Sequence, residues 1–163
     1  NDDSPDYLVS RGEYLTGKLL AEYLGAKFVD AADVIMFHYD GTIDMKRTSE
    51  KLMQYVQGSE KILIPGFYGA TPNGTIKVMS RGGSDITGAV LANIVDADVY
   101  ENWTDVSGFM VVDPRIIPNP ISISRITYSE LREMSYMGAN VLHDDSVFPV
   151  REKNIPTNIR NTN

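Results

Sequence analysis

A glycine pair between an arginine and polar residues is the stretch of this sequence best suited to chemistry. Ser80-Arg81-Gly82-Gly83-Ser84-Asp85 leads into an apolar-periodic segment that predicts a helix. The glycines leave backbone N–H groups uncovered and the helix N-terminus is partly positive, so this run could bind a carboxylate or a phosphate. Arg81 could hold a carboxylate with two parallel hydrogen bonds. An ordinary strand-to-helix turn, with Ser84 or Asp85 as N-cap, explains the same residues equally well.

A second polar run lies seventy residues earlier. Ser10-Arg11-Gly12-Glu13 has the spacing of a capping box, in which Ser10 caps a helix and Glu13 bonds back to it. From the residues alone this structural interpretation is favoured. The functional alternative is that Glu13, at a helix start near the edge of a sheet, binds the ammonium group of a substrate.

Further polar residues follow predicted strands. Thr104 and Asp105 end one strand, and Asp113-Pro114-Arg115 forms a turn after the next. Loops beyond the carboxyl ends of parallel strands bind ligands in open α/β sheets, so Asp105 could orient a nucleotide and Arg115 could meet a phosphate. Each is more often a turn residue. His143-Asp144-Asp145 offers too few ligands to favour a metal site, and no metal ligand is predicted.

The elements that must position these residues alternate between helix and strand. Gly25 and Gly58 are suited to end the first two helices. The apolar residues Leu15, Leu19, Leu20, Tyr23 and Leu24 predict that the first helix buries one broad face. The alternation predicts an open α/β sheet with helices on both faces. The predicted helices span 10–24, 47–57, 84–97, 128–137 and 144–153, and the predicted strands span 27–29, 34–37, 61–64, 75–79, 99–103, 109–112 and 157–160.

Composition excludes several classes of protein. The chain has 163 residues, 42% of them hydrophobic, and a formal charge of -7 without a basic stripe, so a nucleic-acid partner is rejected. It has no cysteine, which excludes disulfides and thiolate metal sites and fits the cytosol. No apolar run reaches the roughly 18 residues of a membrane helix. The polar start is no signal peptide, and because it lacks an initiator Met we expect the natural N-terminus to lie elsewhere.

Taken together, these motifs resemble the aspartokinases in order and spacing. The likeness runs from about Tyr7 to the end and includes Trp103-Thr104-Asp105-Val106 and the stretch 137–143. It implies the amino-acid kinase fold, a three-layer α/β/α sandwich with a mainly parallel sheet. Residues 1–163 would form an incomplete catalytic domain of that fold. Carbamate, glutamate, acetylglutamate and uridylate kinases share the fold but pattern these loops differently.

The resemblance also assigns roles to residues. Arg81 would hold the α-carboxylate of aspartate and Glu13 its amino group, within a substrate loop that includes Gly82, Gly83 and Ser84. Asp85 would be catalytic, helping to organise the phosphoryl-transfer centre. Two positions depart from the family: Met110 replaces a tyrosine, and Asn140 replaces the lysine of many relatives. The residues expected at the nucleotide are Thr104, Asp105, Met110, Arg115, Asn140 and Val141.

The activity implied is phosphorylation of the β-carboxylate of L-aspartate by ATP with Mg²⁺, the first step toward lysine, threonine and methionine. A cytoplasmic homo-oligomer without a tightly bound cofactor is implied as well. The family's Lys-Phe-Gly-Gly loop and its ACT domains have no counterpart in this sequence, so we expect the chain to be inactive by itself. Two alternatives stay open, a binding-only module and a related kinase acting on a different carboxylate.

Overall fold

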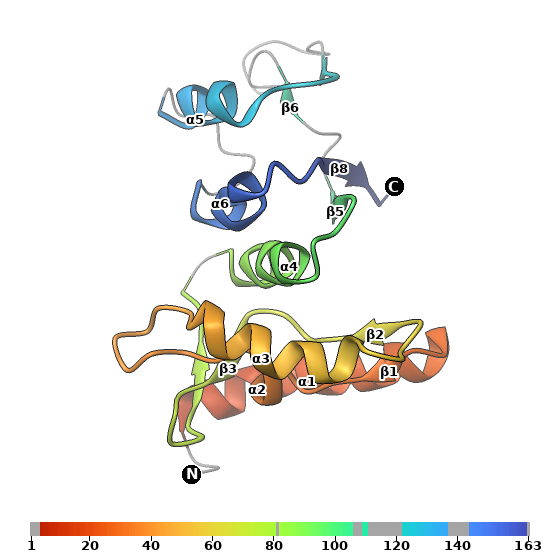
Figure 1. Ribbon diagram of the computed structural model, residues 1–163, viewed down its shortest axis with the longest axis vertical. Coiled ribbons are helices and arrows are strands. Elements are labelled where there is room, and N and C mark those ends of the chain that lie inside the picture. Colours follow the sequence, from red (N-terminus) through yellow and green to blue (C-terminus); the bar gives the residue numbers. More distant parts are fainter. Residues whose placement is uncertain (1–3, 81, 106–108, 111–121, 137–143, 163) are drawn as a thin grey trace.

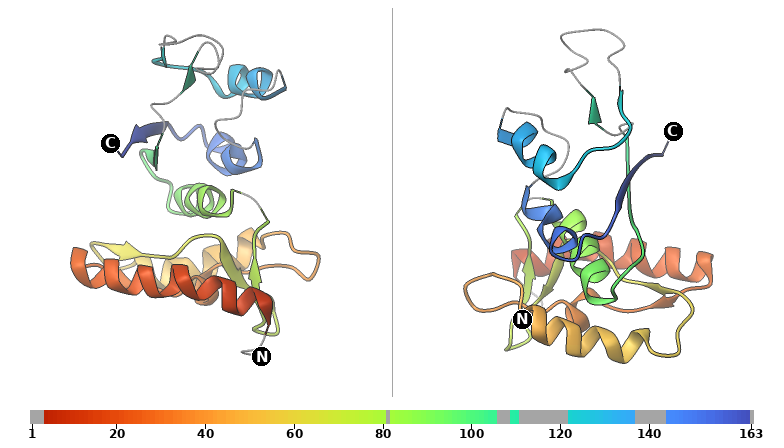
Figure 2. Two further views of the ribbon diagram at one scale, coloured as in Figure 1. Left: turned by 180° about the vertical axis from the view of Figure 1, so that it is seen from behind. Right: turned by 45° about the horizontal axis from the view of Figure 1, so that its top comes forward.

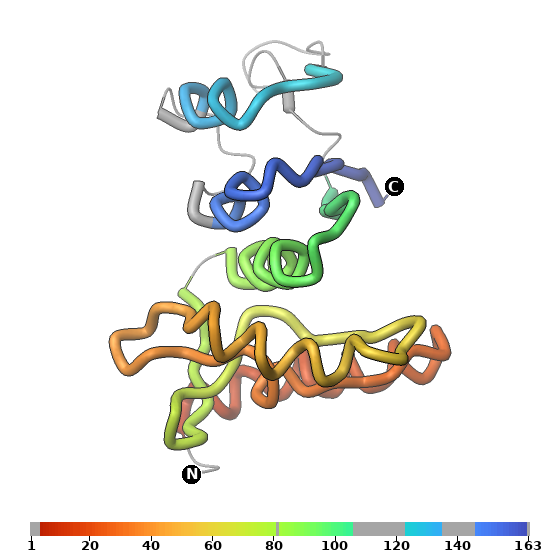
Figure 3. The backbone as a smooth tube through the Cα atoms, viewed as in Figure 1, coloured from red at the N-terminus to blue at the C-terminus, as the bar shows by residue number. Residues whose placement is uncertain are grey.

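The computed structural model describes residues 4–80, 82–105, 109–110, 122–136 and 144–162. The helices lie in layers: α1 (Pro5–Leu24), α2 (Ala31–Val34) and α3 (Met45–Val56) lie together at one end, α4 (Gly83–Ile94) and α6 (Asp144–Glu152) lie in the middle, and α5 (Tyr128–Tyr136) lies at the other end (Figure 1). The view from behind preserves this order (Figure 2). Following the chain, the described residues begin at the outer edge of the first layer, and they end in strand β8 (Thr157–Asn161), which pairs with β5 (Tyr100–Thr104) (Figure 3).

Helices and strands are interspersed along the chain. The helices are α1 (Pro5–Leu24), α2 (Ala31–Val34), α3 (Met45–Val56), α4 (Gly83–Ile94), α5 (Tyr128–Tyr136) and α6 (Asp144–Glu152). The strands are β1 (Lys27–Phe28), β2 (Ile62–Leu63), β3 (Tyr68–Ala70), β4 (Ile76–Val78), β5 (Tyr100–Thr104), β6 (Phe109–Met110), β7 (Ser122–Ile123) and β8 (Thr157–Asn161). They include two runs of three consecutive strands, β2 to β4 and β5 to β7. In the described part of the chain, no helix is long and apolar enough to cross a membrane.

The strands pair two by two. β1 pairs with β2 in parallel and β5 pairs with β8 in parallel, the latter from Tyr100 opposite Thr157 to Thr104 opposite Asn161. β3 with β4 and β6 with β7 are antiparallel. The mixed α/β class and the parallel pairing are therefore confirmed. Within the described residues the strands form four separate pairs, where the sequence predicted one open sheet.

The first helix begins earlier than its sequence pattern predicted. α1 starts at Pro5, and the Ser4 side chain caps it by accepting a hydrogen bond from the Tyr7 N–H at 3.1 Å. The predicted capping box at Ser10 is wrong. Ser10 is fully buried inside the helix, and its hydroxyl donates to the Tyr7 carbonyl at 2.7 Å while accepting from the Arg11 guanidinium. Proline fits the first helical turn because its missing N–H has no partner there, so the helix extends back to it.

The predicted inward face of α1 is also wrong. Leu19 is 71% exposed and Tyr23 is 85% exposed, and Leu8 and Leu15 are exposed beside them. The buried face consists of Ser10, Gly17 and Ala21. These small residues let the helix lie close to the strands: a Cβ at Gly17 would stand 2.9 Å from the Pro65 ring. Close backbone approach, rather than apolar side-chain bulk, thus selects the inner face.

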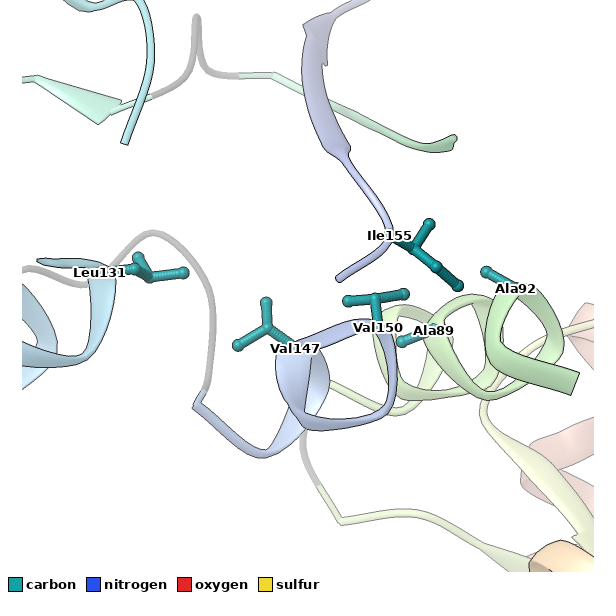
Figure 4. Packing of buried hydrophobic residues seen from close by; sticks show 6 residues of the cluster. All are labelled: Ala89, Ala92, Leu131, Val147, Val150 and Ile155. Carbon is teal, nitrogen blue, oxygen red and sulfur yellow. The ribbon is translucent and has the colours of Figure 1, made fainter. Parts of the chain in front are cut away.

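Two hydrophobic cores meet at α4. One core joins α4 to α6, α5 and Ile155 just before β8, and its side chains point toward one another (Figure 4). The other core fills the layer of α1 to α3 around Val34, Ile35 and Tyr68, and Leu91 of α4 packs against it. Asn93 of α4 donates to the Pro149 carbonyl at 2.7 Å and so satisfies an end group of α6. α4 is therefore packed on both sides, and this packing fixes the position of its N-terminus.

Candidate functional site

A cavity of about 370 Å³ lies where α1, the end of β2 and the first turns of α4 meet. Glu13 and Thr16 line it from α1, and Ser84 and Thr87 line it from α4. Glu13 and Ser84 are both exposed, so a ligand in the cavity could contact both. Two polar runs seventy residues apart in sequence therefore reach one cavity. The remaining lining is Gly17, Leu20, Leu63, Ile64, Pro65, Gly66, Gly88 and Leu91.

The turn after β2 fixes the first turn of α4. The Phe67 N–H donates to the Thr87 hydroxyl at 3.1 Å, and that hydroxyl donates to the Gly83 carbonyl at 2.8 Å. A Cβ at Gly66 would lie 2.9 Å from the Ser84 Cα, so only glycine permits this approach. Phe67 itself has a φ of 71°, a left-handed conformation that is costly for a bulky residue. Strain of this kind persists where the surrounding contacts determine the backbone.

The glycine pair shapes the start of α4. Gly82 is the N-cap residue, with a φ of 58°, and among the described residues no side chain caps the helix. The prediction that Ser84 or Asp85 is the N-cap is wrong, because both lie inside the first turn. The left-handed N-cap agrees with the need for glycine at this position. The N-terminus of a twelve-residue helix without a side-chain cap keeps backbone N–H groups available for an anion.

Asp85 is held by strand β5. The Asn102 carboxamide donates to one Asp85 carboxylate oxygen at 2.8 Å and to the Tyr100 hydroxyl at 3.2 Å. The Tyr100 hydroxyl donates to the Asp85 backbone carbonyl at 3.3 Å. Burial raises the pKa of Tyr100, the hydrogen bond from Asn102 works against that rise, and the nearby Asp85 charge adds to it. The phenol therefore keeps its proton at neutral pH and remains a donor.

The other predicted residues divide into described and undescribed ones. Thr104 is half-buried at the end of β5, and its hydroxyl donates to the exposed Asp105 carboxylate at 3.3 Å. The backbone of Met110 lies in β6. Arg81, Arg115, Asn140 and Val141 lie outside the described residues, so the contact expected between Arg81 and a carboxylate stays a prediction.

Another hollow, of about 480 Å³, lies on α5. All of its lining residues lie between Ile123 and Met134, and they include Arg125 and Glu130. It contains none of the predicted site residues. Where the structure describes the chain, no group of three or more histidine or acidic side chains is arranged to hold a metal ion.

Comparison with known proteins assigns this arrangement to a family. The model of the amino acid kinase family matches residues 2–161. The chain belongs to the amino acid kinase family. Among characterised members, aspartokinase 3 of Bacillus subtilis is 37% identical over 97% of the chain. The chain spans 37% of the length of that protein.

Solved amino acid kinase structures are similar in fold. The aspartate kinase of Clostridium acetobutylicum matches with a TM-score of 0.87 and 54% identity over 98% of this chain and 36% of its own. Escherichia coli aspartokinase III, solved with aspartate and ADP, matches with a TM-score of 0.86 and 30% identity over 96% of this chain and 37% of its own. A uridylate kinase from Archaeoglobus fulgidus, at 22% identity, shares the fold.

Sequence reasoning missed the residues that support the site. Asn102 was not singled out, although Tyr100, Asn102 and Thr104 alternate along β5 and therefore share one face. The polar Asn102 in the middle of this face was the sequence feature that could have identified it. The role of Thr87 could not be predicted for another reason. Its hydroxyl accepts a hydrogen bond from the Phe67 N–H, in a turn twenty residues away, and no local pattern predicts that contact.

Proposed function

We propose that the chain is part of an aspartate kinase, which transfers the γ-phosphoryl group of ATP to the β-carboxylate of L-aspartate. The observation that carries the proposal is that Glu13 and Ser84 line one cavity at a helix N-terminus that no described side chain caps. The carboxylate of Glu13 suits the ammonium group of an amino acid. The glycine-rich start of α4, with Arg81 next to it, suits the α-carboxylate.

The charges of the two substrates determine what the site residues must do. The attacking group is already a carboxylate anion, so the reaction needs no general base. Catalysis then consists of holding the two substrates in line and neutralising charge on the transferred phosphoryl group. In this proposal Glu13 and the α4 loop hold aspartate, and Asp85 helps to organise the transfer centre. Thr104 and Asp105 lie near the nucleotide, which enters as the Mg²⁺ complex.

Similarity supports the same conclusion. The relatives of 30–54% identity described above are aspartokinases, and one was solved with aspartate and ADP. Because the chain spans a little over a third of their length, we propose that the activity belongs to the whole protein and that the chain alone is inactive. Cytoplasmic location and homo-oligomeric assembly of the whole protein stay predictions.

The test is ADP release coupled to a spectrophotometric readout, with L-aspartate and Mg-ATP, for the chain and for the whole protein. We expect turnover by the whole protein only. Glu13→Gln should raise the KM for aspartate by about tenfold or more, because a charge-assisted hydrogen bond contributes about 1.5–3 kcal/mol. Glu22→Gln, on an exposed part of the same helix, is the matched control.

Each outcome bears on one alternative. Aspartate binding by calorimetry without turnover in the whole protein would favour a binding-only module. Turnover with glutamate or acetylglutamate in place of aspartate would favour a related kinase acting on a different carboxylate. Robust turnover by the chain alone would contradict the expectation that it is inactive.

A further inference from the structure

Asp85 is the member of the proposed site that points away from the cavity of Glu13 and Ser84. Its carboxylate is hydrogen-bonded to strand β5 through Asn102, whereas its neighbour Ser84 lines the cavity. A single turn of helix thus presents one residue to the α1 side and the next to the β5 side. The direction of the Asp85 carboxylate is therefore set by β5.

We propose that Asn102 is a positioning residue that fixes the Asp85 carboxylate for phosphoryl transfer, an inference that rests on the proposed function. Asn102 is only 7% exposed, and its side-chain nitrogen reaches Asp85 at 2.8 Å. A carboxylate that accepts a hydrogen bond from a buried amide is restricted in rotation, and Asn102 bonds to only one of the two Asp85 oxygens.

The amide is itself held in place. Its nitrogen also donates to the Tyr100 hydroxyl at 3.2 Å, and that hydroxyl donates to the Asp85 carbonyl at 3.3 Å. The three residues form a closed ring of hydrogen bonds between β5 and α4. Tyr100 also fits against Gly88, where a Cβ would stand 2.6 Å from the phenol oxygen. The strand and the helix therefore cannot slide without breaking the ring.

The same strand carries a residue expected at the nucleotide. Thr104 follows Asn102 by two positions, so both lie on one face of β5, and β8 pairs along the whole strand. Asn102 thereby fixes the position of the Asp85 carboxylate relative to the end of β5, where Thr104 and Asp105 lie. A fixed spacing between a group at the transfer centre and the nucleotide loop is what in-line transfer requires.

The variant that tests this role is Asn102→Leu, which keeps the volume and removes the donor. In the whole protein we expect kcat to fall roughly 10- to 100-fold, while the KM for aspartate changes less than about threefold. Glu101→Gln, on the opposite and exposed face of β5, should leave kcat unchanged. If Asn102→Leu does not fold, Asn102→Ser replaces it, since its hydroxyl is too short to keep the 2.8 Å contact.

A double-mutant cycle shows whether the effect passes through Asp85. In an Asp85→Asn background, Asn102→Leu should change the residual kcat less than about twofold, because the carboxylate it positions is gone. An undiminished effect there, or a wild-type kcat in the single variant, overturns the positioning role while the proposed function stands. Absence of turnover in the wild-type whole protein overturns the proposed function and, with it, this role.

Discussion

Two glycines of α1 should respond in opposite directions to the same substitution. Gly12 and Gly17 both lie in the interior of the helix, where alanine is favoured over glycine by about 1 kcal/mol. Apart from its own helix backbone, a Cβ at Gly12 would meet no atom of the described residues within 4 Å. A Cβ at Gly17 would stand 2.9 Å from Pro65 Cγ, 3.3 Å from Phe28 Cε2 and 3.4 Å from Leu63 Cδ2.

These contacts set the expected sizes. Gly12→Ala should raise the free energy of unfolding by about 0.5–1 kcal/mol. Gly17→Ala gains the same helix preference but overpacks a rigid proline ring, which costs about 1–3 kcal/mol, so its net effect is a loss of about 0–2.5 kcal/mol. Because the helix preference is common to both, the difference between the two variants isolates the overpacking at about 1–3 kcal/mol.

Urea unfolding followed by circular dichroism measures that difference. With an m-value of about 2 kcal/mol/M, the two midpoints should differ by about 0.5–1.5 M, with unchanged slopes. Equal stabilisation by both substitutions would refute the close approach of α1 to Pro65. It would also remove the reason why small residues, rather than the leucines, form the inner face of this helix.

Two further predictions concern buried hydrogen bonds. Asn93→Ala removes the side-chain donor that lies 2.7 Å from the Pro149 carbonyl oxygen. In urea titrations it should lower the free energy of unfolding by about 1–3 kcal/mol. A change within experimental error would contradict the capping of α6 by Asn93. Burial and the hydrogen bond to Asp30 raise the pKa of Tyr68, so the folded protein retains this proton at a pH where the unfolded chain loses it. Stability should therefore fall as pH rises above about 10, and Tyr68→Phe should make that fall shallower between pH 9 and 11; an unchanged slope would show that Tyr68 does not contribute.

Most of the secondary structure could be predicted because it depends on local patterns, although the strand predicted at 34–37 is wrong: α2 ends at Val34, and only single bridges form at Met36 and Phe37. The expected helices at 47–57 and 84–97 lie close to α3 and α4, and the expected strand at 157–160 lies within β8. Gly25 has the left-handed φ of 62° that its position at the end of α1 predicted. Such features depend on apolar periodicity and on backbone freedom, and both can be read from consecutive residues.

Features set by distant contacts were predicted poorly. β3 was not predicted, because Gly69 must lie against Ile35, where a Cβ would collide with the carbonyl oxygen, and a strand containing glycine gives a weak pattern. The buried face of α1 was predicted wrongly because it depends on which strands pack against the helix, and the sequence of the helix alone does not show this. For the site, the motifs identified Glu13 and Ser84, which do line one cavity, whereas Asn102 needed the packing of β5 on α4.

The leucines on the outside of α1 have a practical consequence. Leu8, Leu15 and Leu19 share one solvent-facing side of the helix with Tyr23. Apolar surface of this kind is attracted to any other apolar surface, and ordering salts such as sulfate strengthen that attraction. The isolated chain should therefore aggregate, and scatter more light, as ammonium sulfate is added. Replacing Leu15 and Leu19 by glutamate should prevent this aggregation without unfolding the protein.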